Sequence, residues 1–187
     1  MTHISKNLKG ADLPPVALPD FVTAMSQHAT AVTIITTIHS NLRYGLTATA
    51  MSSLTAAPPR LLVCVNKSGA THEKIIAAGI FAVNVLSEDQ EKVAKAFSGM
   101  LGKDFNRFSV GDWTVLATGC PILHNTSSSF DCKLVQTIDQ STHSIFIGEV
   151  LATVAKPGTD ALVYANRRFR HLRKSIAPPQ GDDIEYL

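Results

Sequence analysis

Cysteine is scarce in this chain, and its spacing excludes a disulfide framework. The three cysteines, Cys64, Cys120 and Cys132, lie far apart and form no CxxC pair. An odd number of widely separated cysteines favours reduced thiols over paired ones. Cys64 lies in the strand-like run LLVCV and Cys132 in FDCKLV, which predicts that both thiols pack in a core.

Long apolar runs and blocks of like charge are also missing. No stretch approaches the ~18 apolar residues that a membrane-spanning helix requires. The net charge is +2 without a long basic block, so nucleic acid is not expected as the main partner. The opening residues, MTHISKNLKGADLPPVALPD, lack the apolar centre of a signal peptide and are typical of a polar arm kinked by proline. We therefore expect a cytoplasmic protein that uses neither a membrane nor a nucleic acid.

The common catalytic and binding motifs are absent as well. The sequence contains no GxGxxG of a dinucleotide site, no GxxxxGK[ST] of a P-loop and no GxSxG of a hydrolase. Its seven histidines form no HExxH or HxH pair, so we expect no metal site. A nucleophilic serine stays open, although nothing in the sequence marks one.

The chain does contain enough apolar sequence for one domain with a substantial core. Hydrophobic residues make up 45% of the 187 residues and charged residues 17%. We expect a flexible arm over residues 1–19, one domain over 20–172 and a tail over 173–187. Apolar and β-branched runs predict strands over 31–38, 45–59, 60–66, 80–87, 129–138, 144–155 and 161–165, and a short edge segment over 168–172.

Three helices are expected among these strands. Asp20 is expected to cap the first, over 20–29. Thr71 is expected to cap the second and Gly79 to end it, and Ser87 to cap a third through EDQEKVAKAF. Residues 99–127 have no clear period and predict a long irregular excursion. Because hairpin-scale turns join most strands, the pattern predicts an antiparallel barrel rather than a doubly wound sheet.

The segment over 45–59, GLTATAMSSLTAAPP, is the most unusual stretch of the sequence. It carries five hydroxyl side chains and no charge, although it otherwise predicts a buried return strand. Composition alone favours an ordinary threonine-rich barrel strand, but small residues and short hydroxyls also suit a planar cofactor with a polar edge. Alternation puts four of the hydroxyls on one face and Ser52 on the other, unless a bulge resets the register; the four are Thr47, Thr49, Ser53 and Thr55.

Two further features are able to carry chemistry. Residues 66–71, NKSGAT, run from a strand end into a helix start, where free N–H groups, one lysine and hydroxyls suit a phosphate. A solvated turn with a threonine cap explains the same residues equally well. His143 opens an apolar strand in QSTHSIFIGEV, and a lone histidine is more often a packed or capping residue than a catalyst.

Several sequence pieces, taken in their order along the chain, resemble the short-chain flavin reductases, the NAD(P)H-dependent partners of two-component flavin monooxygenases. The similarity runs from about Phe21 to Leu172. It rests on AVTIITT, GLTATAMSSLTAAPPRLLVCVN, FAVNVLSEDQ, FSG, RF followed by Trp113, GCP, THSIFIGEV and LVYANRRF. The TATA run and the RRF ending look most like the reductase components of aromatic hydroxylases, such as those acting on 4-hydroxyphenylacetate, and of the pyrimidine-ring monooxygenase.

The resemblance implies a homodimeric, antiparallel Greek-key split barrel with a few flanking helices. It implies that FMN or FAD is reduced by NADH or NADPH through hydride transfer to flavin N5, and that the reduced flavin goes to a separate monooxygenase. His143 matches the family histidine near the flavin and nicotinamide and is the implied catalytic residue. Four other parts of the chain match family segments with a known place at the cofactor. These family segments contact the isoalloxazine ring, receive the phosphate, border the cofactor with an FSG piece, and supply a basic-aromatic pair at the mouth of the site. These implied cofactor-binding residues are Thr47, Ala48, Thr49, Ser52, Ser53, Leu54, Thr55, Asn66, Lys67, Ser68, Thr71, Phe97, Ser98, Gly99, Arg168 and Phe169.

Two positions depart from the family pattern, and they bear on the nicotinamide more than on the flavin. Ser141 stands where members often carry a glycine, and Arg170 stands where many carry a histidine. Two other functions also fit the sequence. One is a non-catalytic flavin carrier or sensor of the same fold. The other is a split-barrel oxidase like the pyridoxamine-phosphate oxidases, for whose substrate phosphate the chain offers only Arg167, Arg168 and Arg170.

Overall fold

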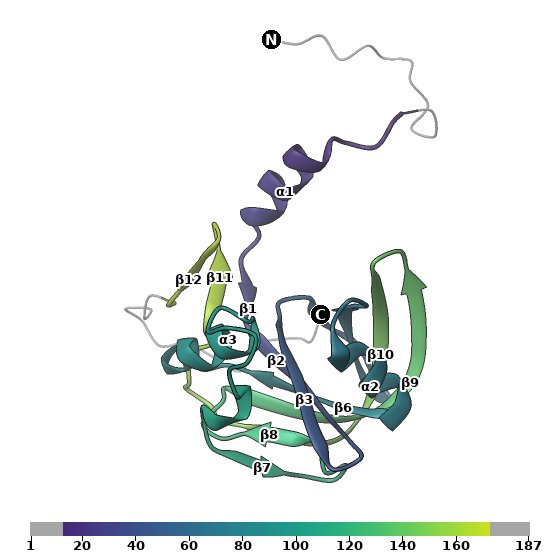
Figure 1. The fold of residues 1–187 in the computed structure, drawn as a ribbon, viewed down its shortest axis with the longest axis vertical. Coiled ribbons are helices and arrows are strands. Elements are labelled where there is room, and N and C mark those ends of the chain that lie inside the picture. The colour runs from purple at the N-terminus through teal and green to yellow at the C-terminus, as the bar shows by residue number, and fades with distance from the viewer. Residues whose placement is uncertain (1–12, 173–187) are drawn as a thin grey trace.

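Strands make up most of the regular structure of this protein (Figure 1). The computed structural model describes residues 13–172, so most of the expected arm and the whole expected tail lie outside the described residues. The helices are α1 (Leu18–Ser26), α2 (Ala70–Ala78), η2 (Glu88–Gln90), α3 (Glu91–Phe97) and η3 (Arg107–Ser109). The strands are β1 (Thr30–Ala31), β2 (Thr33–His39), β3 (Leu42–Ala48), β4 (Met51–Ala56), β5 (Pro59–Asn66), β6 (Ile80–Val85), β7 (Trp113–Val115), β8 (Pro121–Leu123), β9 (Ser128–Gln140), β10 (His143–Ala155), β11 (Val163–Ala165) and β12 (Arg168–Arg170).

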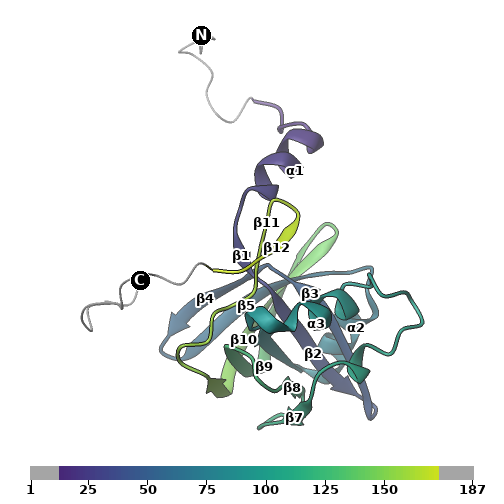
Figure 2. The same ribbon diagram turned by 90° about the vertical axis from the view of Figure 1, so that its left-hand side faces the viewer.

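The largest sheet has seven antiparallel strands in the order β3-β2-β6-β9-β10-β5-β4. β3 and β4 follow each other in the chain, yet they form the two opposite edges of this sheet. The sheet must therefore curl, as the ribbon shows (Figure 2). Thr49 and Ala50 connect the end of β3 to the start of β4. There the chain itself, rather than a ladder of hydrogen bonds, joins the two edges. The fold is thus a split barrel, which confirms the predicted mainly β, antiparallel architecture.

The prediction of a single return strand over 45–59 is wrong. β3 pairs with β2 as far as Ala48, and β4 pairs with β5 from Met51, so the segment changes edges at its middle. A register shift between Ser53 and Thr55 adds a bulge at Leu54. Alternation along one segment cannot reveal either event, because both depend on which neighbours the strand finds in the sheet.

The barrel interior is filled by one face of each strand. Along β5, Leu61, Val63 and Val65 are buried in the interior cluster, whereas Leu62 and Cys64 are only half-buried. The packing reaches the backbone of β10: a Cβ added at Gly148 would lie 2.4 Å from the Phe81 ring. A glycine is therefore required there because no other residue leaves room for the aromatic ring.

The flanking helices follow the sequence signals with small shifts. α2 ends at Gly79, whose φ of 67° is left-handed as predicted, but its N-cap is Gly69 rather than Thr71. α1 begins before Asp20 because Pro19 occupies its first turn, where a missing N–H costs nothing. Ser87 closes a capping box with Gln90 at the start of η2, as expected for this cap. Within residues 13–172, no helix is long and apolar enough to cross a membrane.

The excursion over 99–127 is mostly irregular, as predicted, but it contains η3 and the β7–β8 pair. Buried Asn84 fastens it to the barrel. Its side-chain amide donates to the Ile34 carbonyl at 3.1 Å, and its Oδ1 accepts the Leu123 N–H at 2.9 Å. A buried amide with both ends bonded specifies one position for β8 on the sheet.

The cysteines are free thiols, as the sequence predicts. Cys120 and Cys132 are buried, and burial is the main cause that raises their pKa from 9.0 to about 11 and to about 12. Core packing is therefore confirmed for Cys132. The same expectation is wrong for Cys64, which is half-buried because it alternates with the interior residues of β5.

Candidate functional site

Several predicted site residues meet along one strand, β5. The Cys64 N–H donates to the Ala50 carbonyl at 3.0 Å, which joins the hydroxyl-rich segment to β5. Asn66 lies two residues beyond Cys64, about 7 Å along the strand, and begins the predicted phosphate turn. Asn66 also pairs with His143 in the β5–β10 ladder. The topology thus brings Ala50, the turn and His143 to the same end of β5. The rest of the hydroxyl-rich segment runs away from that end, because Ser53 pairs with Leu61 and Thr55 with Arg60.

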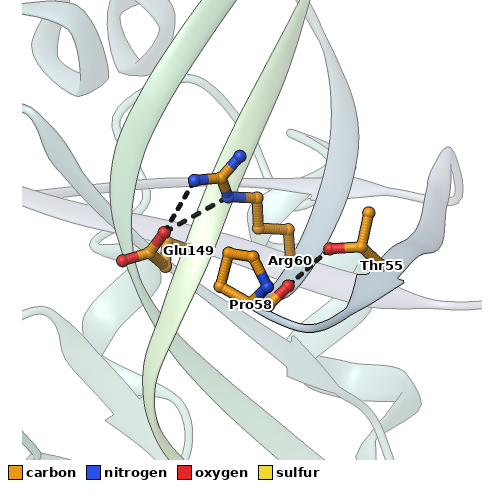
Figure 3. Close-up of polar contacts among 4 residues, drawn as sticks. All are labelled: Thr55, Pro58, Arg60 and Glu149. Atoms are coloured by element: carbon orange, nitrogen blue, oxygen red, sulfur yellow. Dashed lines mark hydrogen bonds and ion pairs between the residues drawn. The ribbon is translucent and has the colours of Figure 1, made fainter.

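Two hydroxyls of the segment bond backbone carbonyls of the protein itself. Thr47 Oγ1 donates to the Ala94 carbonyl at 2.7 Å and so ties α3 to β3. Thr55 donates to the Pro58 carbonyl in the β4–β5 turn (Figure 3). These threonines therefore stabilise local structure, and each would have to give up its bond in order to donate a hydrogen bond to a ligand.

Among the described residues, the other three hydroxyls make no bond to a neighbouring element. Ser52 is exposed and donates to the Ser53 carbonyl at 3.1 Å. Within residues 13–172, neither Thr49 nor Ser53 has a side-chain hydrogen bond, so both hydroxyls are free for a ligand. Ala48 is half-buried beside them, and Leu54 is exposed at the bulge. Thr49 and Ser53 are thus the members of the segment best suited to bond a ligand.

A largely apolar cleft of about 470 Å³ lies beside Thr49. Tyr164 and Arg167 line it, as does one side of α1. The Tyr164 ring packs against Phe169, with ring centroids 5.4 Å apart, and the neighbouring Arg168 is exposed on β12. The basic-aromatic pair predicted for the site mouth therefore lies on the strand next to one wall of this cleft.

The turn over 66–71 is shaped by its own polar groups. Asn66 Oδ1 accepts the Ser68 N–H at 2.8 Å, and the Lys67 N–H donates to the Thr142 carbonyl at 2.9 Å. Thr71 is buried in the first turn of α2. The first N–H groups of α2 have no partner within a helix, and they form the positive end of its dipole. The turn therefore presents a weakly positive end beside the β9–β10 hairpin.

His143 is exposed at the first position of β10. Its Nδ1 lies 2.9 Å from Thr142 Oγ1. Directly opposed residues of two strands share a face of the sheet, so His143 and Asn66 both lie on the outer face. The imidazole is therefore open to a ligand that reaches past the turn.

A second cleft, of about 400 Å³, lies between the start of α2 and the loop that precedes η3. Three cations line it, Arg43, Lys103 and Arg107. The Arg107 guanidinium donates to the Gly45 carbonyl at 3.0 Å, and Arg43 lies over the Phe108 ring at 4.5 Å. Sequence reasoning gave these cations no role. Arg43 and Lys103 lie in a hairpin and in the aperiodic excursion, and the RF piece that contains Arg107 served only for the resemblance.

The FSG piece lies at the end of α3. Phe97 is buried and packs on Phe108 and Trp113, with ring centroids 4.9 and 5.4 Å away. Ser98 Oγ donates to the Lys95 carbonyl at 3.0 Å, and half-buried Gly99 leads into the loop with a φ of 85°. Phe97 thus packs from the interior against Phe108, and Phe108 lines the second cleft. Ser98 lies at the surface.

This donor set suits a flat ligand with a polar edge and an anionic end. Thr49 and an apolar wall line the cleft at the barrel split, and cations line the cleft at the start of α2. Within residues 13–172, no group of three or more His, Cys, Asp or Glu side chains is placed to hold a metal ion. The arrangement can therefore bind and orient a redox cofactor that supplies its own chemistry.

Comparison with known proteins points to one family. A family model described as a flavin reductase like domain matches residues 25–173. The FMN reductase (NADH) RutF of Variovorax paradoxus (strain S110) is 37% identical over 177 residues, which cover 94% of this chain and 96% of that protein. The similarity thus spans the whole barrel.

Two solved structures share the fold. The NADH:FAD oxidoreductase SgcE6 of Streptomyces globisporus C-1027, in complex with NAD and FAD fragments, superposes with a TM-score of 0.79 at 27% identity, covering 88% of this chain and 100% of that one. BorF, the flavin reductase component of a bacterial two-component tryptophan halogenase, superposes with a TM-score of 0.76 at 31% identity, covering 84% of this chain and 99% of that one.

Proposed function

This chain belongs to the flavin reductase-like family, and from that premise we propose that it reduces FMN or FAD with NADH or NADPH and supplies the reduced flavin to a separate monooxygenase. The observation that carries the proposal is the meeting at one end of β5 of the Thr49–Ala50 crossing, the phosphate-type turn and His143. Relatives named FMN reductase (NADH), and a neighbour that is the reductase component of a two-component halogenase, support the cofactor, the hydride donor and the partner.

The residues of the split hold the ring and the turn holds the phosphate. When bound, the flavin supplies the redox chemistry by accepting a hydride at N5 from the reduced nicotinamide. Thr49 and Ser53, with backbone amides of the split, bond the polar edge of the ring and oppose the negative charge that develops there. Lys67, Ser68 and the first N–H groups of α2 bind the phosphate.

His143 acts on the nicotinamide side. Its imidazole is exposed beside the turn, so it can contact and orient the dihydronicotinamide while the ring is held at the split. Hydride transfer depends on the alignment of donor and acceptor more than on acid or base strength. Loss of this side chain should therefore slow the chemical step more than it weakens flavin binding.

The protein acts as a homodimer through the outer face of β5 and β10. Two ladder pairs, Cys64–Ile145 and Leu62–Ile147, place four half-buried apolar side chains on this face. A contiguous apolar surface on a sheet is typical of a protein–protein contact. A second copy of the chain would cover it and would bring the edge of the contact next to His143, which lies on the same face.

The test is hydride transfer measured by steady-state and stopped-flow absorbance, with each nicotinamide and each flavin. We expect oxidation of NADH or NADPH that depends on added FMN or FAD. His143→Ala should lower the rate of flavin reduction about ten- to a hundredfold, while the dissociation constant for flavin should change less than about threefold.

His124→Ala is the matched control, because His124 is also an exposed histidine but lies on the β8 side of the barrel. It should leave both quantities unchanged. No turnover with any pair of nucleotide and flavin would contradict the reductase function and leave a flavin carrier. Equal losses of rate and affinity in His143→Ala would make His143 a structural residue.

A further inference from the structure

A chain of polar contacts runs from α2 through β10 to the lysine of the phosphate turn. His72 Nε2 lies 2.8 Å from Ser144 Oγ, and Ser144 Oγ donates to Asp139 Oδ1 at 2.6 Å. The same carboxylate oxygen lies 3.3 Å from Lys67 Nζ. The ammonium of Lys67 is therefore held on the β9–β10 hairpin.

The inner part of this chain is fixed. Ser144 and His72 are buried, and the His72 ring packs on Phe146 with centroids 5.1 Å apart. The Ser144 hydroxyl has one hydrogen, which it donates to Asp139. Its oxygen must therefore accept a hydrogen bond from the N–H at Nε2 of His72. The buried groups thus aim one oxygen of the exposed Asp139 carboxylate.

The carboxylate stays charged at neutral pH. The hydrogen bond from Ser144 and then the contact with Lys67 lower the pKa of Asp139 below its usual value. Lys67 is the one cation in the NKSGAT turn. Its charge is therefore balanced by an oriented anion before any ligand arrives.

We propose that Asp139 competes with the flavin phosphate for the Lys67 ammonium and so keeps flavin affinity low enough for the flavin to leave after each turnover. This inference rests on the proposed function, in which Lys67 contributes to the phosphate turn. A phosphate that binds Lys67 must first displace Asp139, so part of its charge-assisted bonding is offset. A reductase that serves a separate oxygenase needs such release, because its product must reach another active site.

The experiment compares FMN with riboflavin, which lacks only the phosphate, in fluorescence titrations at about 0.15 M salt, where distant charges are screened. Asp139→Asn removes the charge and still accepts the Ser144 hydrogen bond. It should tighten FMN about two- to fivefold, within the range of an exposed ion pair. Riboflavin affinity should stay constant, and the flavin should dissociate more slowly after reduction.

Two further proteins isolate the role of Lys67. In the Lys67→Met background, Asp139→Asn should change FMN affinity by less than about twofold, because no ammonium remains to be released. Glu91→Gln is the control for the loss of an acidic partner elsewhere. It removes the ion pair on α3 in which Glu91 Oε1 lies 2.5 Å from Lys95 Nζ, and it should leave the affinities for FMN and riboflavin unchanged.

The outcomes separate this inference from the proposed function. If wild type prefers FMN to riboflavin and Lys67→Met removes that preference, but Asp139→Asn changes nothing, the competition is wrong and the phosphate turn stands. Equal tightening of FMN by Asp139→Asn with and without Lys67 would also overturn the competition. If wild type binds FMN and riboflavin equally, the phosphate turn itself is wrong and the competition falls with it.

Discussion

Thr47 and Thr49 carry the same side chain two residues apart, yet their hydroxyls have different surroundings. Thr47 bonds the Ala94 carbonyl of α3 at 2.7 Å. Thr49 lines the cleft beside the split, and no side-chain hydrogen bond involves it within the described part of the chain. The structure therefore divides two neighbouring threonines into one that stabilises the fold and one that is available to a ligand.

The same substitution at both positions tests this division, because Thr→Val removes the hydroxyl and nearly keeps the shape. Thr47→Val should lower the free energy of unfolding by about 1 kcal/mol, the net value of a hydrogen bond. Thr49→Val should leave the free energy of unfolding unchanged and raise the dissociation constant for FMN about three- to tenfold. Urea denaturation and flavin titration of both variants measure the four quantities. A loss of FMN affinity in Thr47→Val alone would reverse the assignment.

Composition favoured an ordinary barrel strand for the hydroxyl-rich segment, and only the family resemblance implied that it contacts a ligand. Neither indicated which hydroxyls are free. That distinction depends on α3 lying over β3, which supplies the acceptor for Thr47, and on the β4–β5 turn, which supplies the acceptor for Thr55. Both acceptors are backbone carbonyls, and a carbonyl leaves no mark in a sequence. Arg43 and Arg107 were missed for a similar reason, since only folding brings them to one cleft.

The contact between α3 and β3 depends on one glycine. A Cβ added at Gly45 would lie 2.7 Å from the Phe97 ring and 3.1 Å from the Ile35 carbonyl. Phe97 is buried among other aromatic rings and has little room to move. The close approach of this helix to the strand thus requires the absence of a side chain at Gly45.

Gly45→Ala should overpack this contact and lower the free energy of unfolding by about 1–3 kcal/mol. Phe97→Leu alone should also destabilise, because it leaves a small cavity. The double variant should be more stable than the sum of the two losses predicts, since the smaller side chain makes room for the new methyl group. Chemical denaturation of the four proteins gives the coupling; simple additivity would mean that the backbone, and not Phe97, absorbs the methyl group.

Elements were predictable where composition decides them. β5 and β6 are continuous apolar runs between turn residues, and α2 ends at a glycine, so their existence and type follow from local chemistry. The change of edges at Thr49 and Ala50 was not predictable. It results from the curling of a seven-stranded sheet, a property that no short window of sequence contains.

At the scale of the molecule, the sheet has one filled face and one apolar face turned outward. Val63 and Phe146 fill the interior, whereas Leu62, Ile145 and Ile147 alternate with them and lie half-buried on the outside. A surface strand of a monomer would carry polar residues at these positions. The outer face of β5 and β10 therefore has the composition of a covered surface, and we expect a second copy of the chain to cover it.

Ile145→Lys tests this contact, because it places a charge at the centre of the proposed dimer face. Wild type should sediment with twice the chain mass of 20.1 kDa, and the variant with the mass of one chain. Ile76→Lys is the matched control, since Ile76 is 49% exposed on α2, outside the proposed face; it should remain dimeric. Circular dichroism should report an intact barrel in both, because neither side chain is in the interior. If Ile145→Lys keeps the dimeric mass, this face is not the contact, and α1 becomes the stronger candidate because Leu18, Phe21 and Met25 are exposed on it.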